Sequence, residues 1–258
     1  MRVLFLGTGT SHGIPMIGCH CAVCRSDDPR DTRTRPSILV TLAGGTVLVD
    51  TATDLRAQSL RFGVEQVDAL LFTHSHADHI FGLDETRRFN IVSGRPLPLY
   101  ADDRTLDDLR RVFAYALSAR PTEGGGVPAL TPFRIAGPFT LLGQHIVPVP
   151  VLHGRRPILG FRMGAFAYLT DCNAIPDSSL PLLTGLEVLV LDALRYRKHS
   201  THFTVDEAVA TAARIGARQT YLTHLCHDLR HATLLDELPP DVAPAYDGLV
   251  IDLPDGAG

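Results

Sequence analysis

The sequence predicts a layered α/β fold in which two β-sheets lie inside outer helices. Two observations favour this fold class. Short apolar, β-branched runs punctuated by glycine or aspartate recur along the chain, and helical patterns occur between them at intervals. The 258 residues, 45% of them hydrophobic, are enough for one large core, and no linker or repeat divides them. We therefore expect residues 1–258 to form one domain.

The first half of the chain alternates strand and helix patterns. Apolar runs predict strands at residues 2–7, 37–44, 46–51, 68–74 and 97–101. Helices are expected at residues 54–63, from about residue 78 to residue 91, and at residues 102–119. In the last of these helices, apolar side chains recur near helical spacing at Leu106, Leu109, Val112, Phe113 and Leu117.

The second half is richer in strands. The glycine-rich residues 121–128 predict a loop. Strands are expected around residues 133–136, 139–152, 158–163, 166–170, 186–193, 220–225 and 249–253. Helices are expected at residues 204–215 and 228–238. Thr204 and Glu207 have the spacing of a capping box, which predicts that the first of these helices begins there.

Composition and charge exclude several classes of protein. The net charge is −4 with 20% charged residues, so the chain has no polybasic face and nucleic-acid binding is not expected. The apolar run at the start is too short for a signal peptide, and no stretch approaches the roughly 18 apolar residues of a membrane span. We therefore expect a cytoplasmic protein without membrane contact. There, clustered cysteines indicate metal or redox chemistry more than a disulfide.

The strongest feature is a cluster of imidazole and carboxylate groups in residues 70–82, LLFTHSHADHIFG. His74 and His76 follow an apolar strand, whose period of two places them on the same side, and Asp78 and His79 fall where the next helix begins. Such ligands suit Zn²⁺, Mn²⁺ or Fe²⁺. Four of them are too many for one tetrahedral site with an open position, so we expect them to serve two adjacent metals.

The motif T-H-x-H-x-D-H after a strand resembles the signature of the metallo-β-lactamase fold. That fold is a four-layer αββα sandwich with a dinuclear metal site at one edge. The chain is most similar to the branch that contains the phosphoribosyl 1,2-cyclic phosphate phosphodiesterases, the PhnP-type enzymes. It shares with them the start GTGTSHGIP, a Cys-x-Cys-x-x-Cys loop within about residues 8–36, and a late LTHxxHD.

The resemblance implies a ligand set for two active-site metals. The first metal would take His74, His76 and His153, the second Asp78, His79 and His224, and Asp171 would bridge them. The residues point the same way, because His153, Asp171 and His224 each close an apolar run, where a strand would deliver them to one sheet edge. Asp50 matches an acid that orients metal ligands.

The resemblance also implies that His202 contacts the scissile phosphate and protonates the leaving oxygen. His199 lies three residues earlier and competes for this role, although the capping-box context favours His202. Arg155 and Arg156 follow His153, and contact with a substrate phosphate and simple solvation both remain open for them. His202 and the metal ligand Asp78 are the residues expected to carry catalysis.

Cys19, Cys21 and Cys24 suit a separate, structural zinc. Three thiolates can wrap one Zn²⁺ and leave one tetrahedral position open. Spacing alone leaves His20, Cys226 and His227 as candidates for that position, and the resemblance favours His227. No role is assigned to His12, which lies in a loop that approaches the site if the resemblance holds.

These features predict a dinuclear metal-dependent phosphodiesterase. We expect metal-hydroxide attack on a small phosphodiester, cyclic or open-chain, such as phosphoribosyl 1,2-cyclic phosphate, with His202 as general acid. Two alternatives stay open: a non-catalytic binding or carrier protein on the same scaffold, as in pyrroloquinoline quinone biosynthesis, and a hydrolase of RNA phosphodiesters or thioesters. The expected partner is a small-molecule substrate, and a homodimer is left open.

Overall fold

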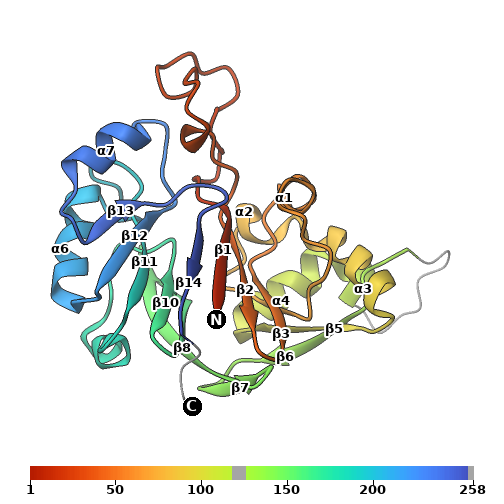
Figure 1. Ribbon diagram of the computed structural model, residues 1–258. Helices are drawn as coiled ribbons and strands as arrows, with labels where there is room; N and C mark the ends of the chain where they lie inside the picture. The colour runs from red at the N-terminus through yellow and green to blue at the C-terminus, as the bar shows by residue number, and fades with distance from the viewer. Residues whose placement is uncertain (118–125, 255–258) are drawn as a thin grey trace.

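The computed structural model describes residues 1–117 and 126–254. Within these residues the strands form two mixed sheets of seven strands each, which face each other with helices on their outer sides (Figure 1). The predicted four-layer αββα sandwich is confirmed. None of the helices in the described part of the chain is long and apolar enough to cross a membrane.

The first sheet has the order β14-β1-β2-β3-β4-β5-β6. Its strands are β1 (Arg2–Gly7), β2 (Ser37–Leu42), β3 (Gly45–Val49), β4 (Ala69–Leu71), β5 (Leu97–Ala101), β6 (Leu130–Arg134) and β14 (Val250–Asp252). The strands from β14 to β3 pair antiparallel, and those from β3 to β6 pair parallel. The parallel strands place the carboxyl ends of β3 and β4 at the same sheet edge.

The second sheet repeats this pattern in the order β13-β12-β11-β10-β9-β8-β7. Its strands are β7 (Phe139–Leu141), β8 (Gln144–His153), β9 (Arg156–Met163), β10 (Phe166–Leu169), β11 (Val188–Asp192), β12 (Gln219–Thr223) and β13 (Val242–Pro244). Antiparallel pairing runs from β7 to β10 and parallel pairing from β10 to β13. The parallel strands β10, β11 and β12 therefore also end together at one edge.

The helices cover the outer faces of the two sheets (Figure 1). The helices on the first sheet are α1 (Leu55–Phe62), α2 (Ala77–Ile80), α3 (Arg87–Ser93), α4 (Asp103–Val112) and α5 (Ala114–Leu117). Those on the second are α6 (Val205–Ile215) and α7 (His231–Glu237). Short 3₁₀ segments occur at Pro29–Asp31, Leu83–Thr86 and Asp177–Leu183. The predicted capping box of Thr204 and Glu207 is present at the start of α6.

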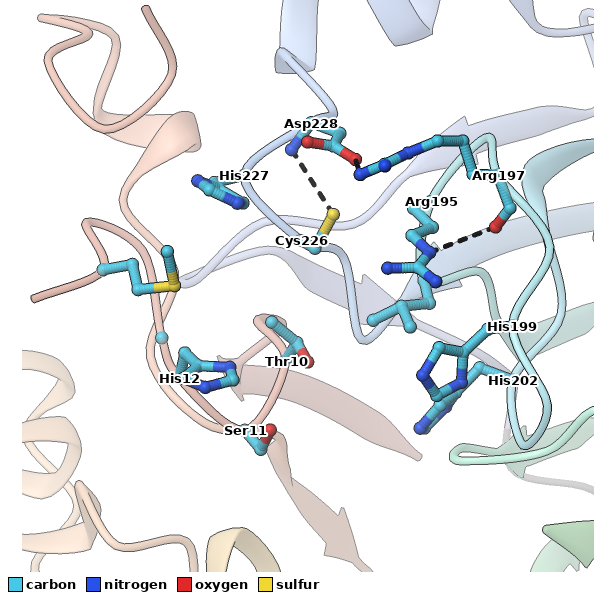
Figure 2. A pocket seen from close by; sticks show the side chains of 13 residues that line it. Thr10, Ser11, His12, Arg195, Arg197, His199, His202, Cys226, His227 and Asp228 are labelled. Carbon is cyan, nitrogen blue, oxygen red and sulfur yellow. Dashed lines mark hydrogen bonds and ion pairs between the residues drawn. The ribbon is translucent and has the colours of Figure 1, made fainter. Parts of the chain in front are cut away.

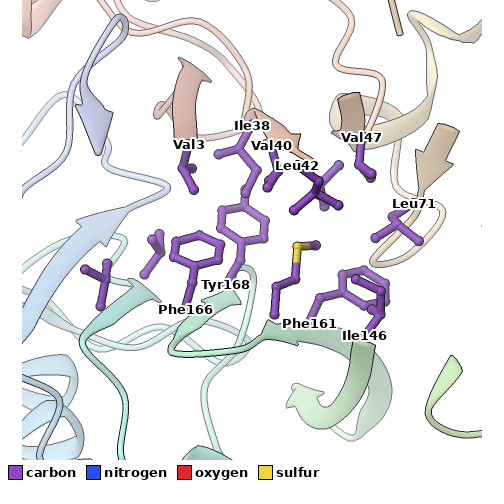
Figure 3. Close-up of a cluster of buried hydrophobic side chains, with 14 of the residues drawn as sticks. Val3, Ile38, Val40, Leu42, Val47, Leu71, Ile146, Phe161, Phe166 and Tyr168 are labelled. Atoms are coloured by element: carbon purple, nitrogen blue, oxygen red, sulfur yellow. The ribbon is translucent and has the colours of Figure 1, made fainter. Parts of the chain in front are cut away.

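The core lies between the two sheets. Side chains from the inner faces interdigitate there, among them Val3 and Ile38 from the first sheet and Phe161 and Tyr168 from the second (Figure 3). Two further buried clusters join each sheet to its outer helices. Full burial of one such side chain is worth about 1.5–3 kcal/mol, so this packing holds the sheet edges at fixed positions.

Three predicted elements were wrong in their continuity. Residues 139–152 form a hairpin, because the chain turns at Leu142 and Gly143 with positive φ angles of 50° and 80°. The expected helix from residue 78 to residue 91 is broken after α2, where the Gly82 N–H donates to Thr51 O at 2.9 Å instead of continuing the helix. The expected helix at residues 102–119 divides at Phe113, whose backbone leaves the helical region.

Other predicted elements differ from the structure in where they begin and end, and one strand was not predicted. The expected helix at residues 228–238 begins only at His231, after a turn in which Leu229 N donates to Cys226 O. The strand expected at residues 133–136 lies at Leu130–Arg134 instead, and β13 was not predicted. The loop predicted at residues 121–128 lies mostly outside the described residues.

The cysteine-containing segment, residues 8–36, stands out from one end of the sandwich, near the carboxyl ends of the parallel strands (Figure 1). Arg33 anchors it. This buried side chain donates from Nη1 to Cys226 O at 3.2 Å and from Nη2 to Leu229 O at 2.8 Å. Its ion pair with buried Asp31 measures 3.3 Å, and Asp31 also accepts the His231 N–H at 2.7 Å. These contacts hold the segment against the loop that follows β12.

Candidate metal centre

Three strand ends turn sharply at the edge where the parallel strands finish. Asp50 after β3, Asp171 two residues after β10 and His224 after β12 have φ angles of 61°, 57° and 61°. Residues other than glycine rarely adopt this left-handed backbone, and it persists only where surrounding contacts enforce it. Each turn delivers a polar side chain from an apolar strand into the space at the sheet edge.

The structure brings the predicted active-site residues together in two groups that share Asp171. One group contains His74, His76, His153 and Asp171, and the other contains Asp78, His79, Asp171 and His224. Within each group the potential ligand atoms lie within 4.8 Å of one another.

The carboxylate of Asp171 faces both groups. Its Oδ2 lies 3.8 Å from His74 Nε2, while its Oδ1 lies 3.2 Å from His79 Nε2 and 3.3 Å from His224 Nε2. One oxygen therefore points to each group, which is the arrangement a bridging ligand needs.

Three of the five histidines in these groups are oriented through Nδ1. His74 Nδ1 lies 3.0 Å from Thr73 Oγ1, His79 Nδ1 lies 2.8 Å from Asp50 Oδ2, and His153 Nδ1 lies 3.0 Å from Thr201 O. Such contacts fix the ring and leave Nε2 for a metal. Asp50 thus lies where the resemblance implies an orienting acid.

The buried Nε2 atoms of His74, His79 and His224 find no hydrogen-bond partner within the described residues. Native proteins rarely leave buried polar atoms without a partner, and a divalent ion supplies one. The donor set therefore fits two adjacent divalent metals.

Burial dominates the electrostatics of these groups. It lowers the pKa of His74 well below its usual value and so favours the neutral imidazole that binds metals. Burial opposes ionisation of Asp171, but the facing imidazoles of His224, His79 and His74 hold its pKa well below the usual range. Burial opposes protonation of His79, but the carboxylates around it, Asp171 foremost, raise its pKa well above the usual value. The site thus surrounds an ionised central carboxylate with imidazole rings.

His202 lies beside both groups and has its own carboxylate. Its Nδ1 is 3.0 Å from Oδ1 of Asp192, and its ring stacks on that of His224 with centroids 4.7 Å apart. Asp192 is fully buried and was missed by the sequence reasoning. The available signal was that it closes the apolar strand β11, as His153 closes β8.

His199 is half-buried rather than a simple exposed loop residue. Its ring centroid lies 5.1 Å from that of His202, and both rings line a pocket of about 250 Å³ next to the metal centre (Figure 2). The opposite wall contains Thr10, Ser11 and His12, so His12 does approach the site.

The two arginines after His153 differ. Arg155 is exposed, whereas Arg156 donates from Nη2 to Ser75 Oγ at 3.0 Å and lies 3.8 Å from Asp108. Ser75 stands between His74 and His76 and donates to the same Asp108 carboxylate. Arg156 is therefore tied to the histidine motif through Ser75.

The cysteine segment forms a separate donor group with His227. His227 Nδ1 lies 3.2 Å from the sulfur of Cys19, 3.5 Å from that of Cys21 and 3.7 Å from that of Cys24. Of the other candidates for the fourth position, His20 is exposed and the Cys226 sulfur accepts a hydrogen bond from Asp228 N.

The thiols of this group differ in acidity. The Cys24 N–H lowers the pKa of Cys21 to about 6, while burial raises that of Cys24 to about 11. One thiolate is thus favoured before any cation binds. Three cysteines and one histidine at these distances fit a tetrahedral Zn²⁺.

Comparison with known proteins identifies the family. The model of the beta-lactamase superfamily domain matches residues 45–225. The chain belongs to the beta-lactamase superfamily. A crystal structure described as a new diphosphatase from the PhnP family has 43% sequence identity and a TM-score of 0.91, and the match covers 98% of this chain and 97% of that one. The predicted metallo-β-lactamase fold and the similarity to the PhnP-type branch are confirmed.

Two further relatives carry names other than diphosphatase. An octanoyltransferase of Porphyromonas gingivalis is 40% identical over 252 residues, which is 96% of this chain but 51% of the relative. The chain therefore spans about half the length of that protein. The Zn²⁺-bound PqqB of Methylobacterium extorquens is 20% identical with a TM-score of 0.79, covering 98% of this chain and 100% of PqqB, and shows the shared fold alone. The family and the PhnP-type neighbour support a hydrolase, and the fold implies binding of divalent metals.

Proposed function

We propose that this protein is a dinuclear metal-dependent hydrolase that cleaves a P–O bond in a small phosphodiester or diphosphate. The observation that carries the proposal is the position of Asp171, with one carboxylate oxygen toward each of two histidine-rich groups. Two Zn²⁺, Mn²⁺ or Fe²⁺ ions held there would supply Lewis acidity and a nucleophilic water near neutral pH.

The ligand roles follow the two groups. His74, His76 and His153 would hold one ion, Asp78, His79 and His224 would hold the other, and Asp171 would contribute to both. Asp78 contributes to catalysis as a ligand in this scheme. Because Asp171 and the second group are almost completely buried, bulk water does not screen their charges, which strengthens their hold on the ions.

His202 serves as the general acid. Its Nδ1–H donates to Asp192, so the ring is held with Nε2 available to carry a proton to the leaving oxygen. Asp192 also accepts the Phe203 N–H at 3.0 Å, which fixes the backbone next to the acid. The proton donor thus has a defined direction before substrate arrives.

Of the two relatives named above with 40% identity or more, the one whose length matches this chain is described as a diphosphatase, which favours phosphate chemistry here. The diphosphatase of the PhnP family is covered over 97% of its chain, whereas the octanoyltransferase is twice as long, so its activity has no necessary connection with this half. The filled ligand set disfavours the non-catalytic carrier alternative. The structural zinc at Cys19, Cys21, Cys24 and His227 and the cytoplasmic location stay predictions, and a homodimer stays open.

Metal analysis and turnover test the proposal together. The purified protein should bind two ions in the active site and one at the cysteines, and should hydrolyse bis(p-nitrophenyl) phosphate or a diphosphate when loaded with Zn²⁺ or Mn²⁺. If the loaded protein cleaved neither class of phosphate, the proposed function would be wrong.

A further inference from the structure

The pocket beside the metal centre contains polar groups that the proposed metal chemistry does not use. Its volume is about 250 Å³. The cysteine segment forms one wall with Ser11 and His12, and the loop after β11 forms the other with Arg195 and His199 (Figure 2). His202 belongs both to this pocket and to the site of the proposed reaction. A substrate within reach of His202 at the metals would therefore also have access to this pocket.

Arg195 is positioned within this pocket by the backbone. Its Nε donates to Arg197 O and its Nη2 donates to Lys198 O, each at 3.1 Å. The side chain is half-buried, and Figure 2 shows the guanidinium between Cys226 and His199. These two bonds hold the planar group in one orientation, and the structure gives Nη1 no hydrogen bond within the described residues.

Arg195 differs from its neighbours in having no carboxylate partner. Arg197 pairs with Asp228 at 3.2 Å, and Lys198 pairs with Glu207. Across residues 1–117 and 126–254, no carboxylate lies within ion-pair distance of Arg195. A fixed guanidinium that faces a pocket without a counter-ion is suited to an anionic ligand, because its fork of N–H donors matches phosphate oxygens.

Other groups in the pocket support an anion. His12 and His199 present further ring nitrogens, and Ser11 offers a hydroxyl. The acid that lines the pocket, Asp228, is neutralised by Arg197 at the rim (Figure 2). The lining is thus rich in donors and leaves little negative charge to repel a phosphate.

We propose that this pocket binds a second phosphoryl group, so that the substrate is a diphosphate with one phosphoryl group at the metals and its neighbour at Arg195. This inference rests on the proposed function. In the reaction, the oxygen of water bonds to the phosphorus at the metals, and the bond from that phosphorus to the bridging oxygen breaks. The bridging oxygen leaves with the phosphoryl group at Arg195, and the protons of water are shared between the two phosphate products.

Binding of diphosphonate tests the pocket without turnover. Calorimetry on the Zn²⁺-loaded protein should show that methylenediphosphonate binds at least about tenfold more tightly than methylphosphonate, because only the former reaches Arg195. Arg195→Gln should lose most of this preference. Arg218→Gln, which removes an exposed arginine directly before β12, should keep it. An equal preference in all three proteins would show that the metals alone create it and would overturn the inference.

Kinetics separate this inference from the proposed function. The measured quantity is the ratio of kcat/KM for a diphosphate, ADP or ADP-ribose, to kcat/KM for bis(p-nitrophenyl) phosphate. Arg195→Gln should lower this ratio at least about tenfold relative to Arg218→Gln. Wild-type turnover of bis(p-nitrophenyl) phosphate with neither diphosphate cleaved would overturn the diphosphate assignment and leave the proposed function standing. If the protein cleaved neither a diphosphate nor bis(p-nitrophenyl) phosphate, both this inference and the proposed function would be wrong.

Discussion

Oδ1 of Asp192 lies 3.0 Å from His202 Nδ1 and also accepts the backbone N–H of Asp171 at 3.2 Å. One buried oxygen thus connects the proposed acid with the carboxylate shared by the two metal groups. Burial raises the pKa of Asp192 well above the usual range, and the charge of Asp171 adds to this. The position of His202 relative to the metal ligands is therefore set by a buried residue outside the two groups that share Asp171.

Asp192→Asn tests this positioning role. Asparagine has one acceptor oxygen, whereas both oxygens of Asp192 accept hydrogen bonds. The side chain can no longer accept from both His202 and the Phe203 N–H, so the ring is held less firmly, and kcat should fall about 10–100-fold. KM and metal content should change little. Steady-state kinetics with metal analysis check this, and Asp192→Glu should recover part of the rate. Loss of bound metal with an unchanged kcat per metal would mean that Asp192 only supports the fold.

His202→Ala removes the proposed general acid. We expect kcat to fall about 10²–10⁴-fold while the metal content stays the same. The loss should be smaller for p-nitrophenyl esters than for alkyl esters of phosphate, because p-nitrophenolate leaves without a proton. His145→Ala, at an exposed position on β8, is the matched control. Equal losses for both kinds of leaving group would contradict a proton-donating role.

Cys24→Ser should remove the metal at the cysteine segment. A thiolate ligand is lost, so one equivalent of Zn²⁺ should disappear and Tm should fall by at least about 5 °C. Cys226→Ala is the control, since its sulfur lies outside the donor group and bonds to Asp228 N. Zinc loss in both variants would assign the fourth ligand to Cys226, and retention of zinc in Cys24→Ser would contradict the site.

Arg33→Met should destabilise the protein strongly. Arg33 is buried with Asp31, so its removal leaves an uncompensated buried charge and two carbonyl groups without donors. Changes of this kind cost about 3–5 kcal/mol of unfolding free energy. Urea denaturation measures the loss, with Arg30→Met, at a partly exposed arginine of the same segment, as control. A loss below about 1 kcal/mol would show that Asp31 and the carbonyl groups find other partners.

His231 should make stability depend on pH. Burial, aided by the charges of Arg30 and Arg33, lowers its pKa to about 4, whereas an unfolded histidine titrates near about 6.5. Between these values the unfolded chain binds more protons, so the free energy of unfolding falls as pH drops from about 6.5 through about 4. His231→Phe should flatten this slope and His145→Phe should not. Equal slopes in all three proteins would show that His231 does not contribute.

The local part of the site was predictable from sequence, and the part made by distant segments was not. His74, His76, Asp78 and His79 lie within six residues after a strand, so strand and helix geometry alone brings them together. His227 required the resemblance, because its contact with Cys19 spans 208 residues. Arg195 gave no signal at all, since its significance depends on which carboxylates lie near it in the folded chain.

The errors in secondary structure have a similar origin. Apolar periodicity identified nearly every strand, but it does not reveal where a run reverses, as at Leu142 and Gly143. Nor does it reveal competition from another segment, as where Gly82 donates to Thr51 O rather than to its own helix. Both features depend on backbone contacts that leave no mark in the hydrophobic pattern.

During translation the cysteine segment is made well before His227, its proposed fourth ligand. A ribosome that adds about 5–20 residues per second needs roughly 10–40 s to pass from the cysteines to His227. During that time three thiols lie on a nascent chain without their histidine, and β1 lacks its partner β14. The proposed structural zinc can therefore be captured in full only near the end of translation, and oxidants or competing metals meet the thiols first.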